Sequence, residues 1–79
     1  MRIDKFLKVS RVIKRRTVAN DAADAGRVTV NGRVVKASYD VKVGDVVEVG
    51  FAQGAVKFRV KSVQETVKKN DAGEMYELL

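Results

Sequence analysis

The chain has 79 residues, which suits one small domain, with 46% hydrophobic residues and 16 basic against 10 acidic side chains. It has no cysteine and no histidine, which excludes disulfides and thiolate metal sites and removes the commonest general base. No stretch approaches about 18 apolar residues and the opening residues form no apolar run, so we expect neither a membrane span nor a signal peptide. These features predict a small cytoplasmic domain without an enzymatic centre or cofactor.

The net charge of +6 is concentrated at one end of the chain. Residues 1–16 hold seven basic side chains and one acidic one, Asp4, so their balance is 7 − 1 = +6. The remaining residues hold nine basic and nine acidic side chains, which cancel. Because an ordinary solvated face mixes the two signs, this concentration predicts a polyanionic partner, most often a nucleic acid.

The first predicted element is a helix over residues 3–10. Its apolar residues fall on one face at about 100° per residue, opposite two lysines. If the helix continued, Val12 would lie among those lysines, so we expect a break near Ser10, whose side chain can satisfy local backbone groups. The apolar face consists of Ile3, Phe6 and Leu7.

A second helix is predicted to begin at Arg15 or Arg16 and to end at Ala25, with Gly26 as a left-handed cap. Its start has no good N-cap residue, and cations are unfavourable at this end of a helix. A bound phosphate would accept hydrogen bonds from the free backbone N–H groups and neutralise the arginines. The apolar face consists of Val18, Ala19, Ala22 and Ala23.

Beyond the second helix, the apolar period changes to two, which predicts short strands over residues 27–63. Asn31-Gly32 is a strong hairpin signal, and residues 34–35 continue as the return strand. Residues 43–45, Val-Gly-Asp, mark another turn before a strand at residues 46–49. The pattern as a whole predicts an α+β fold.

Residues 56–62 alternate between apolar and basic side chains, which predicts a strand with a basic outer face. This face can contact RNA, or it can be a solvated edge strand protected by its cations, and the sequence leaves both open. In the tail, residues 68–73 are expected to form a loop, and the apolar residues after it to dock on the core. The basic face consists of Lys57, Arg59 and Lys61, and the docking residues are Met75, Tyr76, Leu78 and Leu79.

The order of two helices, a glycine, a strand and an Asn-Gly hairpin resembles the S4 RNA-binding domain family. The matching segments are residues 2–7 (RIDKFL), 28–32 (VTVNG) and 43–45 (VGD). The resemblance implies a small S4-type (αL-like) domain in which two N-terminal helices pack on a short, mostly antiparallel sheet. The resemblance covers roughly residues 1–50. Together with the strand pattern, we place the RNA-binding domain at residues 1–63, followed by a C-terminal tail at 64–79 that can dock on the core.

Nearly the whole chain is similar to small stand-alone members that act in bacterial ribosome-associated quality control. The segments that carry this likeness are residues 1–17, 36–38, 40–42 and 68–69 and the closing Met75-Tyr76. It implies binding to rRNA and tRNA on large ribosomal subunits obstructed by peptidyl-tRNA. It also implies support for a partner elongation factor that adds C-terminal alanine tails to stalled chains. We expect a monomer associated with the ribosome.

The candidate RNA-binding residues are the seven cations of residues 1–16. About five phosphate contacts among them predict that log affinity falls with log salt at a slope of roughly −4. We expect recognition of RNA shape, with Phe6 and Phe58 in the core rather than stacking on bases. Replacing Arg2 and Arg16 by alanine is expected to keep the fold and abolish ribosome binding. The candidates are Arg2, Lys5, Lys8, Arg11, Lys14, Arg15 and Arg16.

Two other functions stay open at this stage. One is a heat-shock-type S4 protein that recycles large subunits, although such proteins carry a longer basic C-terminal extension. The other is an adaptor whose basic face docks on an acidic protein. Catalysis is the weakest hypothesis, because the carboxylates form no recognisable pair or metal cluster. These carboxylates are Asp21, Asp24, Asp40, Asp45 and Glu48.

Overall fold

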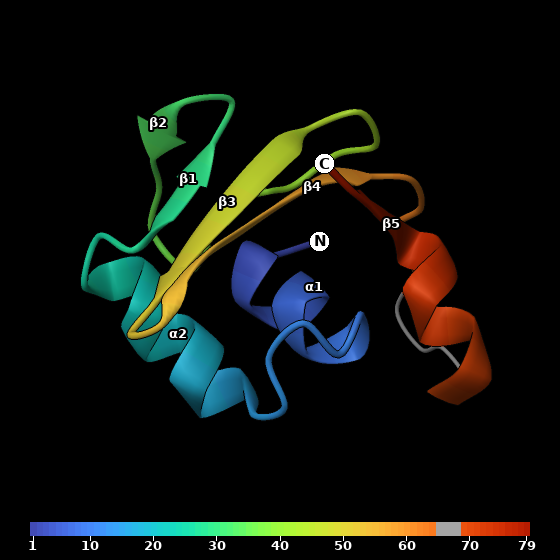
Figure 1. Ribbon diagram of the computed structural model, residues 1–79, viewed down its shortest axis with the longest axis horizontal. Coiled ribbons are helices and arrows are strands. Elements are labelled where there is room, and N and C mark those ends of the chain that lie inside the picture. Colours follow the sequence, from blue (N-terminus) through green and yellow to red (C-terminus); the bar gives the residue numbers. More distant parts are fainter. Residues whose placement is uncertain (65–68) are drawn as a thin grey trace.

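The computed structural model describes residues 1–64 and 69–79, and the side chains of residues 65–71 fall outside this description. Two short helices lie on one face of a five-stranded antiparallel sheet with the order β2-β1-β3-β4-β5 (Figure 1). The predicted α+β architecture is therefore confirmed. The elements are α1 (Ile3–Val9), α2 (Arg16–Asp24), β1 (Val28–Val30), β2 (Arg33–Val34), β3 (Val46–Phe51), β4 (Gly54–Val60), the 3-10 helix η1 (Lys69–Met75) and β5 (Tyr76–Leu78).

The first helix ends where the charge pattern predicts a break. Ser10 is buried, and its hydroxyl donates a hydrogen bond to the carbonyl of Leu7 at 3.4 Å. Arg11 then adopts a left-handed conformation with φ 64°, which stops the helix. Ile13 is buried in the core, and its N–H also bonds to the Leu7 carbonyl, at 3.0 Å. The turn between the helices is thus anchored by Ile13.

The second helix packs through small side chains. Ala19, Ala22 and Ala23 are buried, as predicted, whereas Val18 is 49% exposed, so its placement on the apolar face was wrong. The reason is geometric, because Val18 lies about 100° around the helix from Ala19, at the margin of the buried face. The N-cap residue, Arg15, makes no side-chain capping hydrogen bond, which confirms the poor cap.

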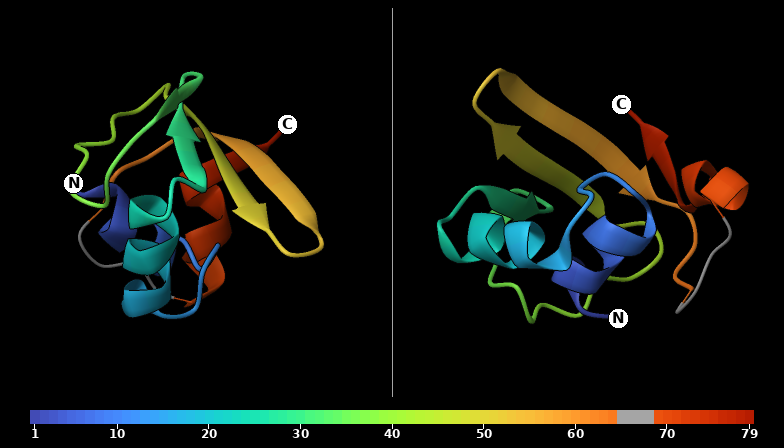
Figure 2. Two further views of the ribbon diagram at one scale, coloured as in Figure 1. Left: turned by 90° about the vertical axis from the view of Figure 1, so that its left-hand side faces the viewer. Right: turned by 90° about the horizontal axis from the view of Figure 1, so that it is seen from below.

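The core lies between the helices and the inner face of the sheet (Figure 2). Phe6 of α1 stacks on Phe58 of β4 with ring centroids 6.0 Å apart, and both are fully buried, as expected. Asn31 and Gly32 take positive φ values of 53° and 83°, which gives the predicted tight hairpin between β1 and β2. The inward strand residues are Val28, Val30, Val47, Val49, Phe58 and Val60.

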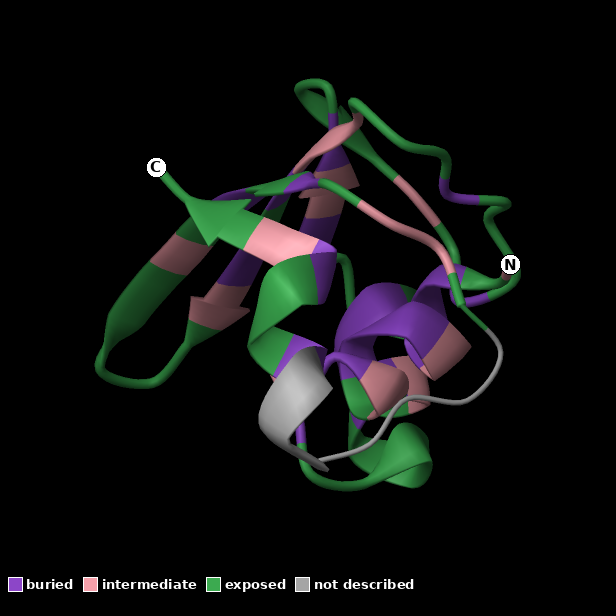
Figure 3. Ribbon diagram, turned by 90° about the vertical axis from the view of Figure 1, so that its right-hand side faces the viewer, coloured by how far each residue is buried: buried purple, intermediate pink, exposed green. Residues whose placement is uncertain are grey.

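The C-terminal segment departs from the expectation of a loop. Lys68 lies outside the described residues, but residues 69–73 form part of η1, so the loop prediction was wrong there. Met75 is buried and β5 pairs with β4, whereas Leu78 and Leu79 are 66% and 56% exposed (Figure 3). Leu78 ends the edge strand β5 and Leu79 follows it, so their predicted docking on the core was also wrong. In residues 1–64 and 69–79, no helix has the length and apolar character needed to cross a bilayer.

Candidate nucleic-acid interface

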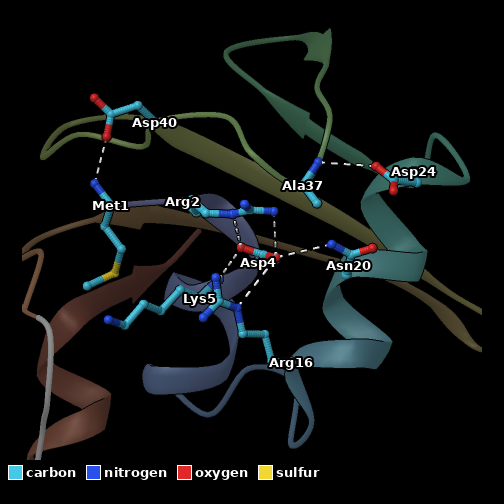
Figure 4. A network of polar contacts seen from close by, with 9 residues as sticks. All are labelled: Met1, Arg2, Asp4, Lys5, Arg16, Asn20, Asp24, Ala37 and Asp40. Atoms are coloured by element: carbon cyan, nitrogen blue, oxygen red, sulfur yellow. Dashed lines mark hydrogen bonds and ion pairs between the residues drawn. The ribbon is translucent and has the colours of Figure 1, made fainter.

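A buried carboxylate, Asp4, joins the two helices. The Asp4 side chain is 2% exposed and accepts hydrogen bonds from the Lys5 N–H at 2.7 Å and from Arg2 Nε at 3.1 Å. From α2, Asn20 Nδ2 donates to it at 3.2 Å, and Arg16 Nε lies 3.5 Å away as an ion pair (Figure 4). Arg16 and Asn20 are four residues apart, so they lie on the same side of α2. Asp4 therefore fixes α2 against the first turn of α1.

The partners of Asp4 keep it ionised. Burial raises the pKa of this carboxyl, but the hydrogen bonds from Asn20, Arg2 and the Lys5 N–H outweigh that effect, together with the charge of Arg16. The net result is a pKa below the ordinary value of 3.8. A charged Asp4 holds both guanidinium groups in place at neutral pH.

Arg2 and Arg16 are brought together from the N-terminal ends of the two helices. Their side chains are 49% and 47% exposed, although each contacts Asp4. A guanidinium has five N–H donors, so each arginine keeps donors that an outside anion can reach. The structure also revises one expectation, because alanine at both positions would leave the buried carboxylate of Asp4 with too few donors. Such a variant would lose fold stability as well as RNA contacts.

The other cations of the first sixteen residues lie along the end of α1, the turn and the start of α2. Four of them are exposed and have no ion pair with any side chain that the structure describes. Lys5 is half-buried, and its side chain runs away from Asp4 (Figure 4). We call the seven cations of residues 1–16, Arg2 and Arg16 included, the N-terminal basic face. The four exposed cations are Lys8, Arg11, Lys14 and Arg15.

Two residues of this site were not recognised from the sequence. From the sequence, Asp4 counted only as the single acid of residues 1–16, and Asn20 was assigned no role. A signal for both was present, because Asp4 is the single acid among seven cations and Asn20 lies one turn after Arg16. Their contact depends on how the helices meet, which the pattern within each helix does not specify.

The second basic face, on the outer side of β4, has a different environment. Lys57 pairs across the strands with Glu48 of β3, and Arg59 pairs with Glu77 of β5. Side chains directly opposite on neighbouring antiparallel strands lie on the same face of the sheet, about 5 Å apart. Two of its three cations therefore have a carboxylate in register on the neighbouring strand, without a direct ion pair, which favours a solvated strand over an RNA contact.

The remaining carboxylates serve the backbone. Asp24 accepts the Ala37 N–H at 3.4 Å, and Asp45 accepts the Lys42 N–H at 2.9 Å. Asp40 pairs with the terminal amine at 2.6 Å, and this hydrogen bond lowers its pKa. In the part of the chain that the structure describes, no three acidic side chains are grouped so that they could hold a metal ion.

Comparison with known proteins agrees with this geometry. The family model of the S4 domain matches residues 1–47, more than half of the chain. The chain therefore belongs to the S4 domain family. Within it, the chain is 53% identical over 79 residues to the RQC P-site tRNA stabilizing factor (RqcP) of Bacillus subtilis, covering all of the chain and 92% of that protein.

Heat shock protein 15 is a further relative. A homologue from Aeromonas salmonicida is 34% identical over 68 residues, which are 86% of this chain but 52% of that protein. The structure of heat shock protein 15 from Vibrio cholerae superposes with a TM-score of 0.92 at 22% identity, covering all of this chain and 81% of the other. This last likeness shows that the two proteins share a fold.

Proposed function

We propose that the chain is an RNA-binding factor of ribosome-associated quality control. It binds rRNA and tRNA on large ribosomal subunits obstructed by peptidyl-tRNA and supports the alanine-tailing reaction of a partner elongation factor. The observation that carries the RNA-binding part is the placement of Arg2 and Arg16 on one buried carboxylate, within a face of seven cations. The 53% identity to a factor named for stabilising P-site tRNA supports the proposed role on the ribosome.

The N-terminal basic face grips the RNA backbone. Arg2 and Arg16 are held by Asp4, so their guanidinium forks are oriented before RNA arrives. The uncapped start of α2 adds free backbone N–H groups beside Arg15, where a phosphate can be bound. Binding by phosphate contacts requires no catalytic group or cofactor, and it recognises RNA by shape. We place the RNA-binding domain at residues 1–63 and propose a monomer that acts on the ribosome in the cytoplasm.

The heat-shock-type function is the first alternative, and sequence identity favours the quality-control factor over it. The chain is 53% identical over 79 residues to the Bacillus factor but 34% identical over 68 residues to the Aeromonas heat-shock homologue. The protein adaptor is the second alternative. It would not require oriented arginines with spare donors, since an acidic protein surface can be met by flexible lysines.

Co-sedimentation with large ribosomal subunits tests the function. The protein should sediment with subunits that carry peptidyl-tRNA, and much less with empty subunits. Nuclease digestion of the RNA should release it. Equal binding to both kinds of subunit would reject the quality-control function, and partner association that survives digestion would instead support the adaptor.

A pair of matched variants tests the site. Both replace three cations by glutamine, so both lower the net charge by the same amount. At about 0.15 M salt each phosphate contact contributes on the order of fivefold in affinity, so losing three should weaken binding about a hundredfold. Replacement on the sheet should weaken it less than about threefold, and equal losses would contradict the assignment. The first variant changes Arg11, Lys14 and Arg15, and the second changes Lys57, Arg59 and Lys61.

A further inference from the structure

One exposed aromatic ring lies next to the N-terminal basic face. Of the five aromatic residues, Phe6 and Phe58 are buried, and Tyr76 packs on Phe58 with ring centroids 5.2 Å apart. Tyr39 and Phe51 are each 37% exposed. Tyr39 belongs to the loop that joins β2 to β3, and this loop passes beside the N-terminus and the start of α1 (Figure 2). Tyr39 lies outside the two ring contacts of the core, Phe6–Phe58 and Phe58–Tyr76.

The backbone ties Tyr39 directly to the start of α1. The Ile3 N–H donates to the Tyr39 carbonyl at 2.8 Å, and Arg2 forms a β-bridge with Asp40. The Tyr39 N–H in turn bonds to the Lys36 carbonyl at 3.0 Å, which holds the loop in a tight turn. Tyr39 is therefore fixed one residue from the strand-like bridge that contains Arg2.

Tyr39 lines a hollow of about 410 Å³ between this loop and the β1–β2 hairpin. Val30 and Val35 supply its apolar lining, and Arg33 lies at its edge. The volume falls within the range of about 300–1,000 Å³ that small-molecule sites occupy. A tyrosine ring, aliphatic groups and an arginine are the surfaces on which a planar nucleobase stacks.

The charge around the hollow also suits RNA. Arg33 and Lys36 are exposed, and neither has an ion pair with a side chain that the structure describes. Three carboxylates near this loop already accept hydrogen bonds, and Asp24 accepts the N–H of Ala37, the residue after Lys36, at 3.4 Å. Asp40 pairs with the terminal amine, and Asp45 accepts hydrogen bonds from Asn31 Nδ2 at 3.2 Å and from a backbone N–H. Arg33 and Lys36 are therefore two exposed cations near the hollow that a phosphate can reach.

We propose that the Tyr39 hollow receives one unpaired nucleobase of the RNA bound on the N-terminal basic face. The base stacks on Tyr39, and Arg33 and Lys36 contact its flanking phosphates. This site rests on the proposed function, because it needs RNA on the neighbouring face. It adds a contact that a fully paired helix cannot make, and so gives the protein a preference for RNA with unpaired bases.

Affinity measurements test the preference. Wild-type protein should bind RNA stem–loops with an unpaired purine about tenfold more tightly than a fully paired duplex of equal length. Tyr39→Ala should remove this preference and leave duplex binding unchanged, while Tyr39→Phe should retain it within about twofold. Phe51→Ala removes a ring of equal exposure at the far end of β3 and serves as the matched control.

Tyrosine fluorescence provides a direct readout. The chain has no tryptophan and two tyrosines, so Tyr76→Phe leaves Tyr39 as the single emitter. Stem–loops with unpaired bases should quench this emission, and paired duplex should not, after correction for RNA absorption. Unquenched emission during full binding, or unchanged affinity in Tyr39→Ala, overturns the nucleobase site while RNA binding stands. Failure to bind any RNA would reject the proposed function itself.

Discussion

The molecule carries two basic faces that resemble each other in composition and differ in their neighbours. On the sheet, Lys57 and Arg59 each lie opposite a glutamate on the next strand, so positive and negative charges alternate. On the helices, Arg2 and Arg16 converge on Asp4, and the four exposed cations of the N-terminal basic face have no ion pair with a side chain that the structure describes. The position of carboxylates, rather than the number of lysines and arginines, separates an anion-binding surface from a solvated one.

The largest expected effect is on the free energy of unfolding when one carboxylate of each basic face is removed. Asp4→Ala should lower the free energy of unfolding by about 2 kcal/mol, because Asn20 loses a buried partner and two arginines repel each other. Because Arg2 and Arg16 are about half exposed, the loss stays below that of a fully buried ion pair. Glu48→Ala, which removes an acid from the sheet face, should change it by less than about 0.5 kcal/mol. Urea unfolding measures both, and similar losses would remove the distinction between the two faces.

Low pH should weaken the contacts of Asp4 and Asp40. Asp4 and Asp40 have lowered pKa values in the folded protein, so the unfolded chain takes up protons first as the pH falls. Their contribution is fully present above about pH 5 and is lost as the pH falls through and below the ordinary value of 3.8. Thermal unfolding across this range should show the loss, and Asp4→Asn should flatten it. A profile in Asp4→Asn as steep as that of wild type would mean that other carboxyls dominate.

The start of α2 allows stability and binding to be separated. Arg15→Ser supplies the missing N-cap and should raise the free energy of unfolding by about 1 kcal/mol. The same change removes a cation from the N-terminal basic face, so RNA affinity should fall about fivefold and the salt slope by about one unit. Titrations at several salt concentrations measure the slope. Tighter RNA binding by the serine variant would contradict a role for Arg15 in phosphate contact.

The left-handed conformation of Arg11 also allows stability and RNA binding to be separated, with a smaller expected change in stability. Arg11 has φ 64°, a conformation that costs a non-glycine residue roughly 1 kcal/mol. Arg11→Gly should therefore gain up to about 1 kcal/mol of stability, whereas Arg11→Ala should gain none, and both should lose the same RNA affinity. A stability gain in the alanine variant would show that the side chain, and not the backbone, carries the strain.

The smallest expected effect is a gain of RNA affinity on the basic face of β4. Glu48→Gln together with Glu77→Gln leaves the cations of β4 without their opposite charges. RNA affinity at low salt should then rise by roughly two- to threefold, with a steeper salt slope. Native gel shifts at two salt concentrations would detect it. If affinity stays the same, cross-strand glutamates are not what keeps this face from binding RNA.

The sequence predicted the elements whose causes are local. The break at Ser10, the left-handed Gly26 and the Asn31-Gly32 hairpin follow from a few neighbouring residues, and all are present. The unpredicted features depend on contacts between distant segments. Asp4 is buried only because α2 covers it, and the exposure of Leu78 follows from its place on an edge strand.

The pairing of both arginines with Asp4 has a consequence for which anions the protein accepts. A small free anion, such as inorganic phosphate, finds two guanidinium groups that a carboxylate already partly satisfies, and it gains little from either. A polymer that presents many phosphates at fixed spacing can use the outward donors of both arginines and the neighbouring cations at once, so its weak contacts reinforce one another. In the proposed function, the internal acid thus makes the surface selective for an extended polyanion over the small anions of the solution.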